Sequence, residues 1–298
     1  MATEIETAVL RAPIGSRRAA ILSALAMSGI AVVIFAPILY YMVLNWGQVA
    51  DYSHGYLIPP LSAYFIWERR KKLARTPIEP SWYGVIPLAL GALALLIGRL
   101  GVEQMSMRVA FVLTLIGLQV LLLGIKMSRV LAFPLCFLFL MVPLPQSLVN
   151  VVTFPLQLIA ADLAVNTLHL FGMPVLREGN ILHLPNYHLF VAQACSGLRS
   201  LMALGTLGVV FAYFFRKSWP ERILLVASTI PIAILVNAFR VALTAVLTIA
   251  WGPQMADGAI HQTEGFFTFG MAFALLMLEA IIVSLLLRSV SRWRRART

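Results

Sequence analysis

The segment that decides the fold runs from Ile223 to Ala250 and reads ILLVASTIPIAILVNAFRVALTAVLTIA. Arg240 is its only charged residue. A helix needs about 20 mainly apolar residues to cross the hydrocarbon core of a bilayer, and this run is longer. The segment therefore predicts a membrane-spanning helix that carries one arginine in its second half.

The composition of the whole chain agrees with a membrane protein. Of its 298 residues, 60% are apolar and only 12% are charged, about half the charged fraction of an ordinary soluble protein. So much apolar surface has to face lipid, which excludes a soluble enzyme and a disordered chain. The two cysteines, Cys136 and Cys195, lie too far apart for a CxxC motif and provide no disulfide framework.

The hydropathy pattern predicts an all-α, polytopic helix bundle with about eight membrane-embedded segments. Their expected ranges are 20–45, 55–67, 82–99, 106–124, 130–143, 198–215, 223–249 and 265–287. The second and fifth are short for a bilayer, and Pro59, Pro60 and Pro134 favour kinks there.

The basic residues predict the orientation. With the N-terminus placed in the cytoplasm, 18 of the 23 Lys and Arg fall on the cytoplasmic side. Such asymmetry follows the positive-inside rule, so we expect both termini to be cytoplasmic. Because these residues are spread over five short segments, the net charge of +11 does not indicate nucleic-acid binding.

We expect one membrane domain, 20–287, between an N-terminal tail, 1–19, and a basic C-terminal tail, 288–298. Its long outer segment, 144–197, begins at a Pro-Leu-Pro breaker and continues into a polar-marked helical pattern from Ser147 to Phe171. We interpret this helix as lying in the interface or re-entering rather than crossing. Two apolar runs around Arg177 to Asn180 predict a small β-hairpin within 174–192.

Cys195 stands in ACSGLRS (194–200), where the outer segment turns into the sixth span. Helix N-terminal amides and the cation Arg199, one turn later, both favour a thiolate, which is the reactive form of cysteine. The alternative is that Cys195 is a small residue packed at a helix start. Cys136, among leucine, phenylalanine and proline in a span, fits a packing role.

Arg240 and His261 belong to the same outer layer as Cys195. Counted from Ile223 at 1.5 Å per residue, Arg240 lies about 25 Å along its helix, and His261 stands in AIHQTEGFF just before the eighth span. Arg240 could instead extend to lipid headgroups, and His261 could be an ordinary loop histidine.

Together the three residues supply the groups for thiol-based acyl transfer. Cys195 is a candidate nucleophile, His261 a proton carrier, and Arg240 a cation facing the developing oxyanion. No HExxH motif or close metal-ligand spacing occurs, so we expect no metal or other cofactor.

At these residues the sequence resembles the exosortase/archaeosortase family of membrane-embedded cysteine transpeptidases. ACSGLRS around Cys195, NAFR ending at Arg240, and HQTEG beginning at His261 occur in the order of that family's Cys, Arg, His set. The stretch SHGYLIPPLSAYFIWERR (53–70) resembles its amino-terminal signature.

The resemblance implies an enzyme that removes the C-terminal sorting tail of exported proteins, of the PEP-CTERM type, through a thioester on Cys195. It implies location in the cell inner membrane, with the active site on the periplasmic side. Arg199 and Arg177 are candidates for binding an acidic residue of the sorting motif, although Arg199 could cap structure or bind lipid phosphate. His54 is a candidate for lining the same site, or for shaping the second span.

A different class of function is the alternative. Arg240 and Glu279, which lies midway along the eighth span, could form an intramembrane polar site in a transporter or a polysaccharide-assembly protein. Glu279 could equally be a hydrogen-bonded carboxyl in helix packing.

Overall fold

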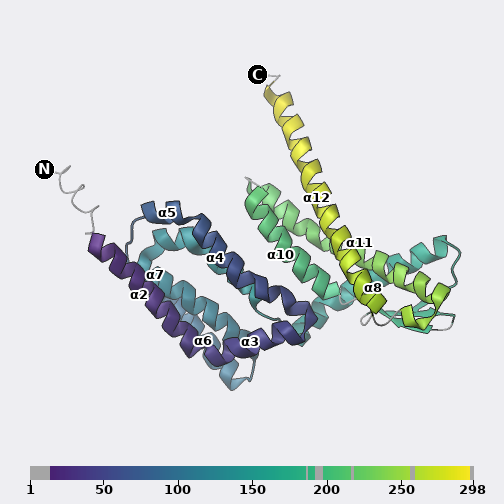
Figure 1. Cartoon of the computed structure of the whole chain (residues 1–298), viewed down its shortest axis with the longest axis horizontal. Helices are drawn as coiled ribbons and strands as arrows, with labels where there is room; N and C mark the ends of the chain where they lie inside the picture. Colours follow the sequence, from purple (N-terminus) through teal and green to yellow (C-terminus); the bar gives the residue numbers. More distant parts are fainter. Residues whose placement is uncertain (1–13, 186, 192–196, 216–217, 256–258, 296–298) are drawn as a thin grey trace. The chain divides into compact units, whose positions relative to one another are not determined.

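The computed structural model describes residues 14–185, 187–191, 197–215, 218–255 and 259–295 (Figure 1). Contacts divide the chain into two compact units, Met1–Pro145 and Gln146–Thr298, and the boundary falls in the Pro-Leu-Pro breaker. The two units are described separately. The chain is a multi-pass membrane protein with a transmembrane helical bundle.

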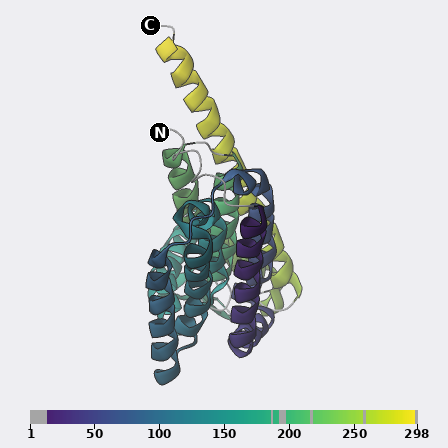
Figure 2. The same cartoon turned by 90° about the vertical axis from the view of Figure 1, so that its left-hand side faces the viewer.

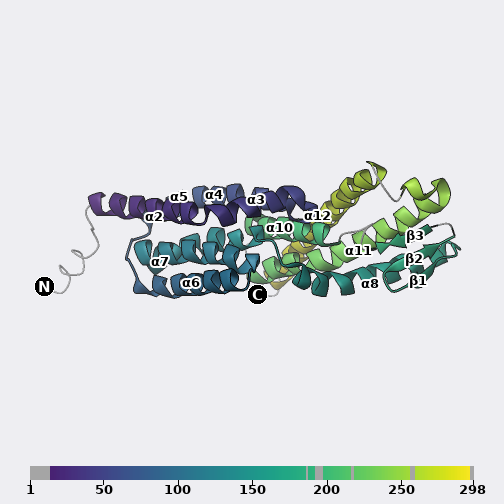
Figure 3. The same ribbon diagram turned by 90° about the horizontal axis from the view of Figure 1, so that it is seen from below.

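Unit 1 is built from helices throughout its described part. In chain order these are α2 (Ile14–Ile34), α3 (Ala36–Gln48), the 3-10 helix η1 (Ala50–Leu57), α4 (Ile58–Glu68), α5 (Arg70–Arg75), η2 (Trp82–Gly84), α6 (Val85–Leu100), α7 (Gln104–Phe137) and η3 (Leu138–Met141). Figure 3 shows them as two layers, with α2 to α5 in one and α6 and α7 in the other. Figure 2 shows the long helices running alongside one another.

α7 consists of two helices joined at Gly124, where the backbone has φ 85° and ψ 172°. A side chain at this position would overlap the carbonyl oxygen of Glu79, so both the conformation and the space require glycine. This break separates the two predicted spans 106–124 and 130–143. The second half runs antiparallel to α4, since Ser62 donates to the carbonyl of Pro134 at 2.8 Å and Arg69 donates to that of Val130.

α7 begins at a side-chain cap. Glu103 accepts hydrogen bonds from the backbone amides of Met105 at 2.7 Å and Ser106 at 2.6 Å. Burial raises the pKa of Glu103, but these hydrogen bonds lower it more, and the result lies below the usual value. An ionised carboxylate here also interacts favourably with the positive end of the helix dipole.

Unit 2 combines helices with one small sheet. Its elements are α8 (Gln146–Leu170), β1 (Leu176–Glu178), β2 (Ile181–Leu184), β3 (Tyr187–Phe190), α10 (Gly197–Phe215), α11 (Trp219–Trp251), η4 (Pro253–Met255) and α12 (Ala259–Arg295). The sheet has the antiparallel order β1-β2-β3, so the predicted hairpin is extended by a third strand.

Two apolar clusters hold unit 2 together. One joins α8, the sheet and the C-terminal part of α11 and includes Leu182 and Leu189 of the sheet and Val241 of α11. The other joins α10, α11 and α12 through residues such as Leu204, Val236 and Leu276. The sheet thus lies against α8 and the C-terminal part of α11 (Figure 3).

Six helices of the described part are long and apolar enough to cross a membrane. They are Arg17–Ile34, Trp82–Leu100, Gln104–Met141, Gln146–Leu170, Trp219–Trp251 and Phe267–Leu285, with Leu201–Phe215 as a shorter apolar helix. The eight predicted segments differ from these six because α7 is counted once, α4 and the apolar part of α10 are short, and α8 is added. α8 is a helix, as predicted, and meets the length and hydropathy of a span. That it lies in the interface stays a prediction.

Candidate active site

The first residue of α10 lies level with Arg240. α10 and α11 are antiparallel neighbours, and a Cβ at Gly208 would lie 2.6 Å from Cγ2 of Thr229. Gly197 stands 11 residues before Gly208, and Arg240 stands 11 residues after Thr229. At 1.5 Å per residue, both positions are about 16 Å from that contact, toward the same end of the bundle.

α12 brings a second helix face to Arg240. The hydroxyl of Ser228 on α11 donates to Oε2 of Glu279 on α12 at 2.5 Å, so these helices are also neighbours. Farther along the pair, a Cβ at Gly265 would lie 3.7 Å from Nη2 of Arg240 and 3.9 Å from its Cζ. The guanidinium therefore lies against the bare backbone of α12 at Gly265.

His261 stands four residues before Gly265 on α12. Residues i and i+4 share a helix face, so His261 belongs to the face that Arg240 contacts, one turn nearer the helix start. The description of His261 extends to its backbone only.

Cys195 and Arg199 flank the first residue of α10. Cys195 falls outside the described residues, two positions before Gly197, and Arg199 is described in its backbone as the third residue of the helix. The backbone positions described around Cys195, Arg240 and His261 thus belong to one end of a three-helix group.

Polar residues accompany Arg240 on the buried side of α11. Asn237 and Thr244 lie one turn to either side and are 8% and 0% exposed. Thr244 donates to the carbonyl of Arg240 at 2.9 Å. Polar groups inside a membrane helix are costly and mark functional sites, and no sequence pattern pointed to either residue.

A family model described as transmembrane exosortase matches residues 46–278. The chain belongs to the transmembrane exosortase family. The matched region contains His54, Cys195, Arg240 and His261. Neither the curated proteins nor the solved structures contain a match.

The amino-terminal signature of this exosortase-family chain holds parts of unit 1 together. His54 in η1 lies 3.2 Å from the carbonyl oxygens of both Asp51 and Leu140, through Nδ1 and Nε2 respectively. Burial lowers the pKa of His54, and these carbonyl contacts oppose the shift without cancelling it. These contacts attach η1 to η3, and the role of His54 at the substrate site stays a prediction.

Arg177 on β1 anchors the sheet to α8. Its Nη1 donates to the carbonyl of Leu158 at 3.1 Å and forms an ion pair with Asp162 at 3.1 Å. This gives Arg177 a structural partner, and its predicted contact with substrate stays a prediction.

The outward face of the sheet carries a histidine pair for which the sequence predicts no role. His183 and His188 are cross-strand partners with Nδ1 atoms 2.9 Å apart, and Nε2 of His183 lies 3.1 Å from Glu178. Within the described ranges, no group of three or more His, Cys, Asp and Glu residues could hold a metal ion.

Proposed function

We propose that this protein is a membrane cysteine transpeptidase that cleaves the C-terminal sorting tail of exported proteins, of the PEP-CTERM type. The observation that carries the proposal is the contact of the Arg240 guanidinium with Gly265, one turn from His261. A cation fixed beside a histidine-bearing helix face, at the level where the Cys195 segment enters α10, supports thiol-based acyl transfer.

In the proposed reaction, the thiolate of Cys195 attacks the scissile carbonyl carbon and forms a C–S bond. Arg240 stabilises the negative charge that develops on the carbonyl oxygen. The C–N bond then breaks, and protonated His261 gives its proton to the departing amine of the tail. The remaining thioester is attacked by an acceptor nucleophile, whose proton passes to His261 as Cys195 is released.

The substrate anchor suits a site at this end of the bundle. A protein held by one C-terminal membrane helix reaches such a site by diffusion in the bilayer plane. By the positive-inside rule this end faces away from the cytoplasm, and the resemblance to the exosortase family implies that it lies on the periplasmic side of the cell inner membrane. Arg199, Arg177 and His54 are proposed to bind the sorting motif, the arginines through its acidic residue.

Co-expression with a sorting-tail reporter tests the proposal. The wild-type protein should remove the tail, and Cys195→Ala and Cys195→Ser should abolish removal while the protein still inserts into the membrane. Cys136→Ala is the matched control, because Cys136 is a free cysteine on α7 of unit 1, and it should process normally. Processing by Cys195→Ala at the wild-type rate would show that the nucleophile is another residue.

Arg240→Lys tests the oxyanion role. A compact ammonium cannot reproduce the planar guanidinium, and loss of one oxyanion donor typically costs about 100-fold or more in rate. Arg222→Lys is the control, because it makes the same change near the other end of α11. There the guanidinium of Arg222 lies over the ring of Trp219. Equal turnover in both variants would rule out the oxyanion role of Arg240.

The alternative is a transporter or polysaccharide-assembly protein with Arg240 and Glu279 as an intramembrane polar site. The partly buried Glu279 within α12 favours it. Its hydrogen bond to Ser228 also fits helix packing, which requires no transport. Reporter cleavage that depends on Cys195 would exclude this alternative.

A further inference from the structure

Unit 1 contains an apolar groove between α2, α4, α5 and α7. Its volume is about 630 Å³, within the range of about 300 to 1,000 Å³ that is usual for sites of small ligands. Leu25 of α2, Ile66 of α4, and Leu115 and Leu131 of α7 are among the side chains that line it. Apart from Leu138 of η3, the walls thus come from four α-helices of a single unit.

The polar side chains inside the groove already have partners. Gln119 donates to the hydroxyl of Ser28 at 3.0 Å, and Ser62 donates to the carbonyl of Pro134 at 2.8 Å. Because these groups bind one another or the backbone, the middle of the groove presents an apolar surface. A hydrocarbon chain is the complement of such a surface.

Two arginines of the lining, Arg17 and Arg70, have neutral partners. Arg17 donates to the carbonyls of Thr76 at 3.0 Å and Leu73 at 2.7 Å. The guanidinium of Arg70 lies 4.0 Å from the ring centroid of Trp67 and donates to its carbonyl at 3.1 Å. A guanidinium has five N–H donors, so both arginines keep donors and a positive charge that these contacts do not neutralise.

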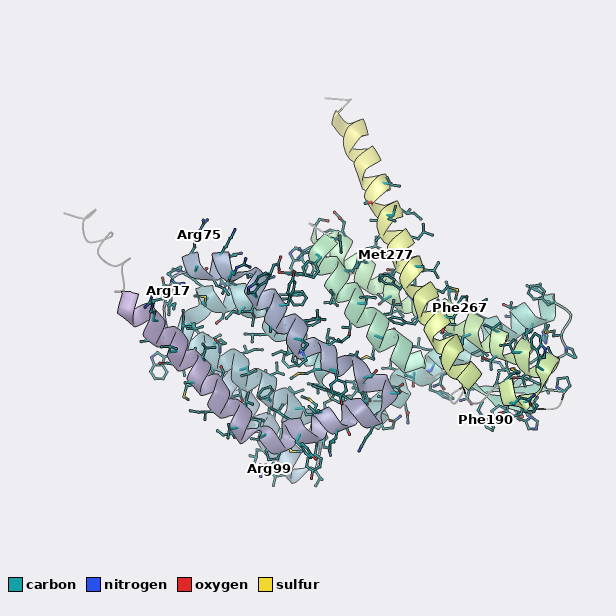
Figure 4. The ribbon with its side chains drawn as sticks, viewed as in Figure 1. Arg17, Arg75, Arg99, Phe190, Phe267 and Met277 are labelled. Carbon is teal, nitrogen blue, oxygen red and sulfur yellow. The ribbon has the colours of Figure 1, made fainter. Side chains whose placement is uncertain are left out.

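These arginines mark the end of unit 1 at which α2 begins and α5 ends. Figure 4 shows Arg17 and Arg75 at this end and Arg99 at the opposite end of the unit. The end coincides with the basic segments that the positive-inside rule assigns to the cytoplasm, where the leaflet is rich in anionic lipid.

We propose that the groove binds one anionic phospholipid, with an acyl chain along the apolar walls and the phosphate between Arg17 and Arg70. The charge selects this occupant, because a guanidinium pair attracts a phosphate with net negative charge. A protein helix that ends in basic residues would place positive charge beside Arg17 and Arg70 and would be repelled. The proposal is independent of the catalytic function.

Native mass spectrometry of the purified full-length protein tests the proposal, with dioleoylphosphatidylglycerol and dioleoylphosphatidylcholine as probes. We expect one phosphatidylglycerol bound about tenfold more tightly than phosphatidylcholine, which corresponds to about 1.4 kcal/mol. Both lipids offer the same phosphate oxygens, but the choline of phosphatidylcholine cancels the negative charge that attracts the two arginines. Inorganic phosphate at the same concentration should not displace it, because the acyl chain contributes to binding. Equal binding of the two lipids, or displacement by phosphate, would overturn the proposal.

Three substitutions locate the lipid. Arg70→Gln should lose about tenfold in affinity for phosphatidylglycerol, whereas the matched control Arg18→Gln, an exposed arginine beside Arg17, should bind as the wild type. Ala74→Trp fills the groove from an exposed position of α5 and should prevent binding of both lipids. Wild-type affinity in both Arg70→Gln and Ala74→Trp would overturn the proposal.

A photo-crosslinking residue at Leu25 identifies the occupant in membranes. Leu25 is 65% exposed and lines the groove, and this experiment leaves the groove open, unlike Ala74→Trp. A phospholipid adduct is the expected result. An adduct with a protein would overturn the proposal.

Discussion

The guanidinium of Arg240 lies against Gly265, where a Cβ would stand 3.7 Å from Nη2. This contact joins α11 to α12 one turn from His261 and fixes where the positive charge lies. The catalytic proposal depends on that position, so the size of the residue at 265 should control activity.

Substitutions at Gly265 test this dependence. A Cβ at 3.7 Å makes ordinary van der Waals contact, so Gly265→Ala should keep most of the activity. Gly265→Leu places further carbons in the space of the guanidinium and should cost about 100-fold, since a displacement of about 1 Å has that effect in active sites. Reporter cleavage measures both. Normal cleavage by Gly265→Leu would show that this contact is not part of the site.

Glu279→Gln separates packing from proton chemistry. The amide oxygen of glutamine still accepts the hydrogen bond that Ser228 gives to Glu279, so processing should stay within about twofold of wild type, and stability within about 1 kcal/mol. Reporter cleavage and thermal unfolding check the two expectations. Complete loss of function with intact folding would instead favour an intramembrane proton site.

His54 makes the stability of unit 1 depend on pH. Because burial lowers its pKa below the usual value of 6.5, the unfolded chain takes up a proton near pH 6.5 while the folded chain does so only at lower pH. The contribution of neutral His54 to the free energy of unfolding is therefore complete above about pH 6.5, and it is lost as the pH falls toward the pKa of His54 in the folded protein.

Thermal unfolding in detergent, compared at about pH 7.5 and about pH 5.5, measures the effect of His54. His54→Gln should show a smaller fall in melting temperature on acidification than the wild type. Ser53→Ala, an exposed neighbour, should keep the wild-type fall. An unchanged fall in His54→Gln would contradict the assignment.

Gly124→Ala should destabilise unit 1. The residue has φ 85°, and a Cβ would overlap the carbonyl of Glu79, so we expect a loss of about 1 to 3 kcal/mol or more. Gly29→Ala in α2 is the control, because a Cβ there meets nothing within 4 Å. It should be neutral or stabilising by up to about 1 kcal/mol. Equal melting temperatures for both variants would contradict this account of the break in α7.

The bilayer explains why much of the helical fold could be predicted from sequence. The length and hydropathy of spans are physical requirements, and the predicted segments 223–249 and 265–287 lie within α11 and α12. The break at Gly124 fell at the predicted end of the span 106–124. The common level of Arg240 and the first residue of α10 follows from counting residues along antiparallel helices.

Other features depend on contacts that no sequence pattern carries. Gly265 has no side chain, so its contact with Arg240 is recognisable only once α11 and α12 are packed. The sequence did not predict a third strand. Ile181–Leu184 pairs with β1 on one edge and with β3 on the other, and this double pairing is set by the register of the sheet. The cluster that Ala161, Ala164 and Leu168 of α8 form with α11 and the sheet was likewise not indicated by the polar side chains of α8, and the interface position that those side chains predict stays a prediction.

The most direct test of the central claim is peptide mass spectrometry of the protein quenched while it processes the reporter. The account predicts that the new C-terminal end of the reporter is bound to the peptide containing Cys195 through a bond that hydroxylamine cleaves, as expected for a thioester. Tail removal without such an adduct, or with the adduct on another residue, would contradict the account.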